Sequence, residues 1–352
     1  MVSVLEASKK LMDQILLEII NLKKAFSART GFLSNDRNKF IRAVDGVTLQ
    51  VRKGETLGLV GESGCGKSTL ARLILHLEIP TEGTITFENN DIFQLKGMQL
   101  KEYRRNVQMI FQDPYSSLNP RMTAGEIIAE PLKVHRLFNK DQRRKSLVEI
   151  AALVGLNEGH LKRYPHEFSG GQRQRIGIAR ALILRPGLIV ADEPVSSLDL
   201  SVQAQILNLM KHLQNELELT SLFITHDFGV VRHMSDRIAV MYQGRIVELG
   251  ETIEICRAPV HPYTQALLRA VPELDPEKKR RSATSNGPEV TGGYSGSCAF
   301  FPRCPLRRNV CKTQEPVLEE YSQGHWVACH NNEKKSLHSE KNGVNGTAPP
   351  GA

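Results

Sequence analysis

Gly61-Glu62-Ser63-Gly64-Cys65-Gly66-Lys67-Ser68-Thr69 is the stretch that decides the fold of this 352-residue chain. It matches the pattern Gly-x-x-x-x-Gly-Lys-Ser/Thr, with an apolar run before it (57–60) and a helical pattern after it (70–77). The glycines let successive backbone N–H groups face an anion, and the helix N-terminus adds partial positive charge. We expect all nine residues to bind a nucleotide, with Lys67 reaching the β- and γ-phosphates and Ser68 binding Mg²⁺.

Three short apolar runs each end at a polar residue or at this loop. Residues 57–60 end at Gly61, residues 188–191 end at Asp192, and residues 222–225 end at His226. Because α/β sheets place ligand sites at the carboxyl ends of their strands, these residues are expected to lie together. Asp192 is then placed to hold Mg²⁺, while Glu193 orients or deprotonates the attacking water. The pattern predicts a nucleotide hydrolase, since no feature indicates the acceptor site of a kinase and the loop lacks Gly-x-Gly-x-x-Gly.

The chain divides into parts of different composition. Residues 14–272 alternate strand and helix patterns, which predicts an α/β core with a mainly helical subdomain inserted at about 101–165. In that insertion Leu147, Ile150 and Val154 recur at helical spacing, with Asp141 expected as the N-cap. The remaining segments are expected to be a linker (273–297), a cysteine-rich appendage (298–330) and a disordered tail (331–352).

Composition and charge describe an ordinary globular protein. The chain is 40% hydrophobic and 24% charged, with a net charge of +8, and its basic runs are interpreted as solvated surface. No stretch approaches the 18 apolar residues needed to span a membrane, and charged residues among the first 21 argue against a signal peptide. We therefore expect a cytosolic protein, held at a membrane only through partners.

A second motif opens another predicted helix. In Phe168-Ser169-Gly170-Gly171-Gln172-Arg173-Gln174-Arg175, a serine and two glycines precede an apolar-periodic run (176–184), so its N-terminal amides can bind an anion. This stretch resembles the signature motif of the ABC ATPases. The resemblance implies that Ser169, Gly170, Gly171 and Gln172 contact the γ-phosphate held by an opposite subunit in a head-to-tail dimer.

Other elements of the same family follow in its order. Gln112, in Phe-Gln-Asp-Pro, resembles the Q-loop glutamine that senses Mg²⁺ and couples to membrane subunits. Ser196-Ser197-Leu198-Asp199 resembles the D-loop, with a serine in place of the common alanine, and Asp199 is its acidic residue. His226 resembles the switch histidine. The resemblance implies that Glu193, His226 and Lys67 are the catalytic residues.

An aromatic residue near the N-terminus matches the family's adenine-stacking position. Phe26, in Leu-Lys-Lys-Ala-Phe, occupies that place. Phe32 and Phe40 lie close by in the sequence and compete with it for the role.

Three further stretches narrow the resemblance to the oligopeptide/dipeptide/nickel importer ATPases. They are residues 111–120, 202–207 and 261–268. The sequence around Tyr115 is closer to that of the F-type subunit than to that of its D-type partner. The resemblance implies an ATPase that powers import of peptides or a related small solute from the cytoplasmic face of the membrane. Its implied partners are a D-type ATPase subunit, two permeases and an extracytoplasmic substrate-binding protein. Dipeptides, longer peptides, sugars and nickel stay open as substrates.

Two other functions compete with this interpretation. A soluble ABC ATPase acting on DNA or the ribosome would use the positive charge, but the chain has no second ATPase core, no long heptad repeat and no aromatic-interleaved basic stretch. Nucleic acid is therefore not an expected partner. A free-standing nucleotide-dependent metal sensor would show ATPase activity that depends on a bound metal without membrane partners.

Four of the six cysteines form a C-terminal group, Cys298-x5-Cys304-x6-Cys311-x17-Cys329. In a reducing compartment such a group binds metal more often than it forms disulfides, and four thiolates suit either [4Fe–4S] or zinc. In the importer family this pattern is associated with a [4Fe–4S] cluster, which we favour over zinc or no metal. His325 and His330 are alternative ligands.

Overall fold

The computed structural model describes residues 14–27, 40–270 and 296–332. Most of the predicted linker (273–295) and of the predicted disordered tail (333–352) lies outside the described residues, as does Phe32. No helix within the three described ranges is long and apolar enough to cross a membrane.

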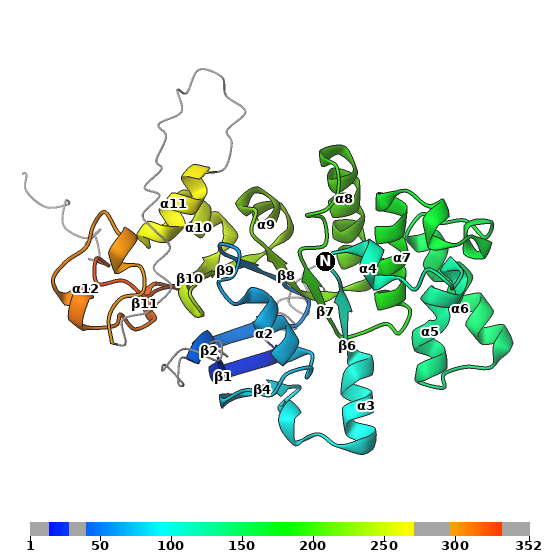
Figure 1. Cartoon of the computed structure of the whole chain (residues 1–352), viewed down its shortest axis with the longest axis horizontal. Helices are drawn as coiled ribbons and strands as arrows, with labels where there is room; N and C mark the ends of the chain where they lie inside the picture. The colour runs from blue at the N-terminus through cyan, green and yellow to red at the C-terminus, as the bar shows by residue number, and fades with distance from the viewer. Residues whose placement is uncertain (1–13, 28–39, 271–295, 333–352) are drawn as a thin grey trace, which may run out of the picture.

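Within the described residues, the main sheet has eight strands in the order β11-β12-β10-β9-β3-β8-β7-β6 (Figure 1). The strands from β9 to β6 run parallel, whereas β10, β12 and β11 pair antiparallel. Their bounds are β3 Thr56–Val60, β6 Val107–Ile110, β7 Leu188–Asp192, β8 Thr220–Thr225, β9 Arg237–Tyr242, β10 Arg245–Glu251, β11 Glu319–Ser322 and β12 His325–Val327. Strands β3, β7 and β8 are buried along their whole length, as expected for parallel strands covered on both faces. The three predicted strand runs and the α/β core are thus confirmed.

A smaller antiparallel sheet has the order β2-β1-β4-β5. Its strands are β1 Ile15–Ser27, β2 Phe40–Arg52, β4 Glu82–Phe87 and β5 Asn90–Asp91. The second half of β2 alternates buried and exposed residues, so one face of this sheet is packed and the other is solvated. Its packed face shares a hydrophobic core with helix α2 and the main sheet, and Cys65 of the phosphate loop belongs to the same core.

Helices cover the remaining faces, and a second core joins several of them to the main sheet. The α-helices are α2 Lys67–Ile74, α3 Gly97–Asn106, α4 Pro114–Ser117, α5 Ala124–Val134, α6 Lys140–Leu153, α7 Gly170–Leu182, α8 Leu200–Leu217, α9 Phe228–Met234, α10 Thr252–Arg257, α11 Pro262–Ala270 and α12 Val310–Thr313. The short 3₁₀ turns are η1 Ile92–Gln94, η2 His160–Lys162, η3 Pro165–Glu167 and η4 Phe301–Arg303.

The stretch 101–165 contains one strand as well as helices. Strand β6 pairs with β7 in the main sheet, and helices α4, α5 and α6 follow it. Helix α6 corrects one prediction: its N-cap is Asn139, two residues before Asp141. Asn139 and Gln142 form a reciprocal capping box, which leaves Asp141 in the first turn.

The cysteine-rich segment extends the main sheet instead of standing apart from it. Strand β12 pairs with β10, and Ala328 N–H donates to the Val247 carbonyl at 2.9 Å. Phe300 joins a third core with Tyr242 and Tyr263. This segment and helices α5 and α6 lie at opposite ends of the molecule (Figure 1).

Candidate functional site

The phosphate loop connects β3 to α2 and needs glycine where its backbone turns. Gly66, the N-cap of α2, has φ 110°, and a Cβ there would lie 2.0 Å from the Ala43 carbonyl oxygen. Gly64 has φ 79°. Residues with a side chain rarely adopt such φ angles, so these two turns of the loop require glycine.

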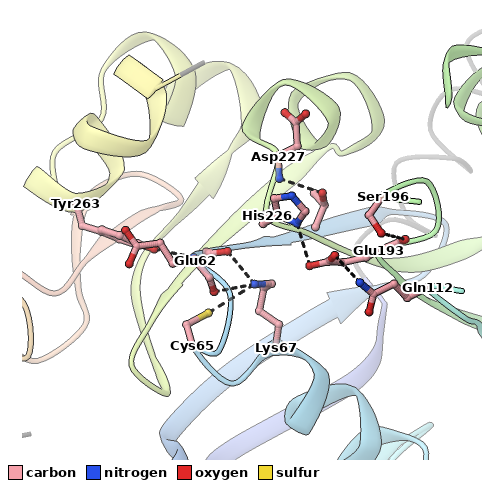
Figure 2. A network of polar contacts seen from close by, with 11 residues as sticks. Glu62, Cys65, Lys67, Gln112, Glu193, Ser196, His226, Asp227 and Tyr263 are labelled. Atoms are coloured by element: carbon pink, nitrogen blue, oxygen red, sulfur yellow. Dashed lines mark hydrogen bonds and ion pairs between the residues drawn. The ribbon is translucent and has the colours of Figure 1, made fainter. Parts of the chain in front are cut away.

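Lys67 is buried at the centre of the loop (Figure 2). Its Nζ donates to the carbonyl oxygens of Gly61 at 2.7 Å and of Glu62 at 2.9 Å. The Sγ of Cys65 lies 3.9 Å from the same nitrogen, and burial raises the pKa of the Cys65 thiol. The ammonium group is therefore held at the place where a phosphate bound by the loop would need positive charge.

Asp192 ends β7 with a buried carboxyl group. Burial raises its pKa, and a hydrogen bond from Ser68 opposes that effect. Its Oδ1 has no hydrogen-bond partner. A buried carboxylate oxygen without a donor, beside a serine hydroxyl, is an oxygen set that suits Mg²⁺.

Glu193 is held between two of the predicted residues (Figure 2). Gln112 Nε2 donates to its Oε2 at 3.0 Å, and His226, with the proton on Nδ1, donates to its Oε1 at 3.0 Å. Its backbone has φ 46°, which is unusual for a non-glycine residue. The Glu193 N–H donates to the Ile224 carbonyl, and its own carbonyl accepts from Ser196 Oγ. These bonds fix the left-handed turn that directs Glu193 away from the strand, so the carboxylate reaches Gln112 and His226.

The signature residues begin helix α7. Ser169 Oγ accepts from the Gln172 N–H and Gln172 Oε1 accepts from the Ser169 N–H, which makes a capping box. The glycines are also required by packing. A Cβ on Gly171 would lie 2.4 Å from Val202 Cγ1, and a Cβ on Gly170 would lie 3.3 Å from Leu198 Cδ2. The signature therefore packs directly on the D-loop and on α8.

The described structure brings some predicted residues together and leaves others apart. In the described part of the chain, no hydrogen bond or ion pair links Ser169–Gln172 to the phosphate loop. Asp199 is the exposed N-cap of α8. Phe26 is 37% exposed at the end of β1, with Lys24 Nζ 5.0 Å from its ring centre, and Phe40 is exposed on the neighbouring strand. Both aromatic residues thus stay open as adenine-stacking candidates.

Two residues that contact the phosphate loop were not predicted. The Glu62 N–H donates to the Tyr263 hydroxyl oxygen at 2.8 Å, and Arg303 forms an ion pair with the Glu62 carboxylate. Tyr263 lies in the 261–268 stretch, whose resemblance to the importer ATPases does not indicate a contact with the loop. Nothing in the sequence around Arg303 indicated a contact 241 residues away.

The four C-terminal cysteines lie near one another. Burial raises the pKa of the Cys329 thiol to about 11, and the thiols of Cys298, Cys304 and Cys311 add to that increase. Among the described residues, however, no three His, Cys, Asp or Glu side chains are arranged to hold a metal ion. The predicted metal-binding appendage is therefore not assembled in this structure.

The two alternative ligands have other hydrogen-bond partners. His325 Nε2 pairs with the buried Glu248 carboxylate at 2.8 Å, and His330 Nε2 lies 3.1 Å from the Gln314 carbonyl oxygen. These bonds engage Nε2 of each ring, and the ligand role of either histidine stays a prediction.

Comparison with known proteins identifies the family. Residues 44–196 match the family model described as ABC transporter, and residues 247–311 match the model of the oligopeptide/dipeptide transporter C-terminal region. The oligopeptide transport ATP-binding protein AppF of Bacillus subtilis (strain 168) is 49% identical over 90% of this chain and 98% of its own length. The dipeptide transport ATP-binding protein DppF of Escherichia coli (strain K12) is 46% identical over 90% of this chain and 95% of its own length.

Solved structures agree with the fold. A dimeric ATP-binding cassette in a post-hydrolysis state, bound to ADP and Pi, has a TM-score of 0.59. It is 31% identical and covers 67% of this chain and 98% of its own length. The predicted P-loop fold and ATP-hydrolysing activity are thereby confirmed. The chain belongs to the ABC transporter ATPases, in the branch of the oligopeptide and dipeptide transport ATP-binding proteins.

Proposed function

We propose that this chain is one of two ATP-hydrolysing subunits that power import of dipeptides or oligopeptides through a membrane transporter. The names of its relatives and the C-terminal family match support the peptide class of substrate. One observation supports the hydrolytic role above the others: the Glu193 carboxylate is fixed between Gln112 and His226 at the strand ends beside the phosphate loop.

In the proposed reaction, the residues of the loop bind and orient the triphosphate. Backbone N–H groups of the loop and the N-terminus of α2 bind the β- and γ-phosphates, and Lys67 moves from the loop carbonyls to the phosphate oxygens. Ser68, Asp192 and Gln112 would hold Mg²⁺. When bound, the ion would neutralise negative charge on the phosphates. The unpartnered Asp192 Oδ1 supports this ligand role.

Glu193 is proposed to act on the attacking water. Its two oxygens already have donors in Gln112 and His226, so the carboxylate keeps one orientation. From it the carboxylate accepts a proton as water attacks the γ-phosphorus, while the bond from that phosphorus to the bridging β-phosphate oxygen breaks and ADP leaves. His226 is 53% exposed in its side chain. It is therefore accessible to the γ-phosphate as well as to Glu193.

The signature helix is proposed to act on the nucleotide of a second ATPase chain. Ser169–Gln172 open α7, whose N-terminus carries partial positive charge, and they make no bond to the phosphate loop of their own chain among the described residues. Asp199 of the D-loop is exposed next to them. We propose a D-type ATPase subunit as the second chain, with two permeases above the pair and an extracytoplasmic binding protein that delivers peptide. The ATPase pair would then lie at the cytoplasmic face of the membrane.

The cysteine group is proposed to bind a [4Fe–4S] cluster, with zinc as the alternative. The donor set fits, because the thiols of Cys298, Cys304 and Cys311 lie close enough to Cys329 to raise its pKa, and the Asn331 N–H donates to Cys329 Sγ at 3.4 Å, as in many thiolate sites. The thiols would have to move together to bind the metal. We propose that the group stabilises the C-terminal segment, since it holds no residue of the nucleotide site.

The proposed function is tested by ATP hydrolysis in lipid vesicles. The chain would be co-expressed with its ATPase partner and permeases, and the rate measured with and without binding protein and a peptide mixture. We expect peptide-loaded binding protein to stimulate hydrolysis several-fold, and the Lys67→Ala variant to show no stimulation. Hydrolysis that is indifferent to permeases and binding protein would contradict the transport role but leave the ATPase assignment standing.

A further inference from the structure

The C-terminal segment contacts the phosphate loop through one arginine. Arg303 Nη1 donates to Glu62 Oε2 at 2.7 Å, and Arg303 Nη2 donates to Glu62 Oε1 at 2.8 Å. This is the two-pronged geometry in which arginine binds a carboxylate most specifically. Residues 241 positions apart in the sequence are thereby joined at the second residue of the loop.

Aromatic packing holds the arginine in place. Its guanidinium lies 5.9 Å from the ring centre of Tyr242 and 5.8 Å from that of Phe300. Phe300 is buried and packs against Tyr242 and Tyr263 at ring-centre distances of 5.3 and 5.5 Å. Arg303 thus reaches the loop across packed aromatic rings. Its side chain therefore loses less conformational entropy on pairing with Glu62 than a fully exposed arginine would.

Glu62 is fixed a second time through its backbone. Its N–H donates to the hydroxyl of the fully buried Tyr263, while its carbonyl accepts from Lys67 Nζ at 2.9 Å (Figure 2). One residue therefore links the C-terminal segment, helix α11 and the lysine of the loop. A change in the orientation of the Glu62 peptide would move the carbonyl that Lys67 contacts.

We propose that Arg303 is a positioning residue for the phosphate loop, one that holds Glu62 and thereby keeps the loop in its nucleotide-binding conformation. Arg303 touches no reacting atom in this role. It lowers the entropy that the loop loses when a nucleotide binds, so its effect falls on nucleotide affinity and not on the chemical step. The proposal rests on the assignment of Gly61–Thr69 as the phosphate loop and goes beyond it by adding a residue outside the motifs.

The test is a double-mutant cycle on the full-length chain, read by equilibrium binding of Mg-ATP and by the split between KM and kcat. Because the Glu62 carboxylate is partly exposed, we expect Arg303→Ala and Glu62→Ala each to weaken ATP binding only about 3- to 10-fold. The double variant should be no weaker than either single variant. Arg303→Lys, which keeps the charge and one hydrogen bond, should recover part of the affinity.

Two controls separate the possible failures. Lys312→Ala removes an exposed positive charge from the same segment and should bind ATP as the unmodified chain does. Lys67→Ala tests the loop assignment itself. If Lys67→Ala loses binding but Arg303→Ala does not, or if the losses from Arg303→Ala and Glu62→Ala add, the positioning role is wrong and the loop assignment stands. If Lys67→Ala binds ATP normally, the loop assignment is wrong, and the proposal falls with it.

A folding defect would be recognised separately. The Glu62→Gln variant leaves the C-terminal segment unchanged and keeps the backbone bond to Tyr263, so it weakens the ion pair from the loop side alone. Reduced ATP affinity in this variant, with an unchanged melting temperature and unchanged kcat at saturating ATP, supports the positioning role. Normal ATP affinity in Glu62→Gln and in Arg303→Ala would overturn it.

Discussion

The phosphate-loop region and the cysteine-rich segment were both singled out by motifs, yet the two differ in how their side chains are assembled. At the strand ends, Lys67, Asp192 and Glu193 lie in place with short hydrogen bonds and buried atoms. Among the described residues of the C-terminal segment the cysteines lie near one another without forming a ligand set, whereas Arg303 makes a two-pronged ion pair with Glu62. The turns of a motif that presents contiguous backbone to its ligand are set mainly by its own glycines. A motif made only of side-chain ligands needs the ligand as well.

The largest expected effect is a loss of ATP turnover when Glu193, at the strand ends, is replaced. Glu193→Gln keeps the shape of the side chain and the hydrogen bond from His226, but the amide cannot accept the proton of water. We expect ATP turnover to fall on the order of 10²- to 10⁴-fold while ATP binding persists, as measured by steady-state hydrolysis and by retention of unhydrolysed ATP. Unimpaired turnover would show that Glu193 is not the base.

A second, smaller effect concerns the metal content of the cysteine-rich segment. Under anaerobic purification we expect a brown protein with about four iron atoms per chain, and loss of both iron and colour in Cys329→Ser. Cys256→Ser, which removes a thiol outside the group, is the matched control and should keep its metal. A colourless chain with about one zinc would favour the zinc alternative. A chain without metal would remove the ligand role altogether.

The smallest expected effect is a pH dependence of stability that arises from His261, which lies between the two regions. Burial lowers the pKa of His261 to about 4, against which the nearby Glu248 carboxylate raises it. The folded chain thus keeps His261 neutral, whereas the unfolded chain binds a proton below its usual pKa near 6.5. Stability should therefore fall as the pH drops from about 6.5 toward 4.

His261→Asn provides the control for that effect. From the pKa of about 4, the residue should account for a loss of about 2 kcal/mol of unfolding free energy between pH 7.5 and pH 5. Asparagine keeps an acceptor for the Tyr263 N–H, which bonds to His261 Nδ1 at 3.1 Å, but does not titrate. The melting temperature of the unmodified chain should thus fall by a few degrees more than that of the variant over the same interval. Equal falls would show that His261 does not stay neutral in the fold.

The sequence allowed the strand ends and the loop to be predicted because their geometry is local. Strands β3, β8 and β7 are parallel neighbours, so Gly61, Asp192 and His226 at their ends come together without further information. Short antiparallel strands at the sheet edge carry no comparable signal. This is why the pairing of β12 with β10 was not predicted, and with it the approach of Arg303 to Glu62.

Packing between helices explains a second feature that the sequence did not predict. The signature glycines were interpreted as opening a helix for an anion, but Gly171 also has no room for a Cβ against Val202. That constraint arises from a contact between α7 and the start of α8, which the periodicity of either helix does not reveal. In the same way, Asp141 fits the N-cap pattern, but Asn139 followed by Gln142 three residues later forms the reciprocal pair that begins α6.

The central claim is that the phosphate loop serves the nucleotide of its own chain, whereas the signature helix serves the nucleotide of a partner. Ser169→Arg in the Glu193→Gln background tests it, with ATP-dependent association with the co-expressed ATPase partner followed by sedimentation velocity. Thr123→Arg, at the capping box of α5, is the matched control for loss of a helix cap. We predict that Ser169→Arg abolishes association while the isolated chain still binds ATP, and that Thr123→Arg does neither. Undiminished association in Ser169→Arg, or loss of ATP binding by the isolated chain, would contradict the claim.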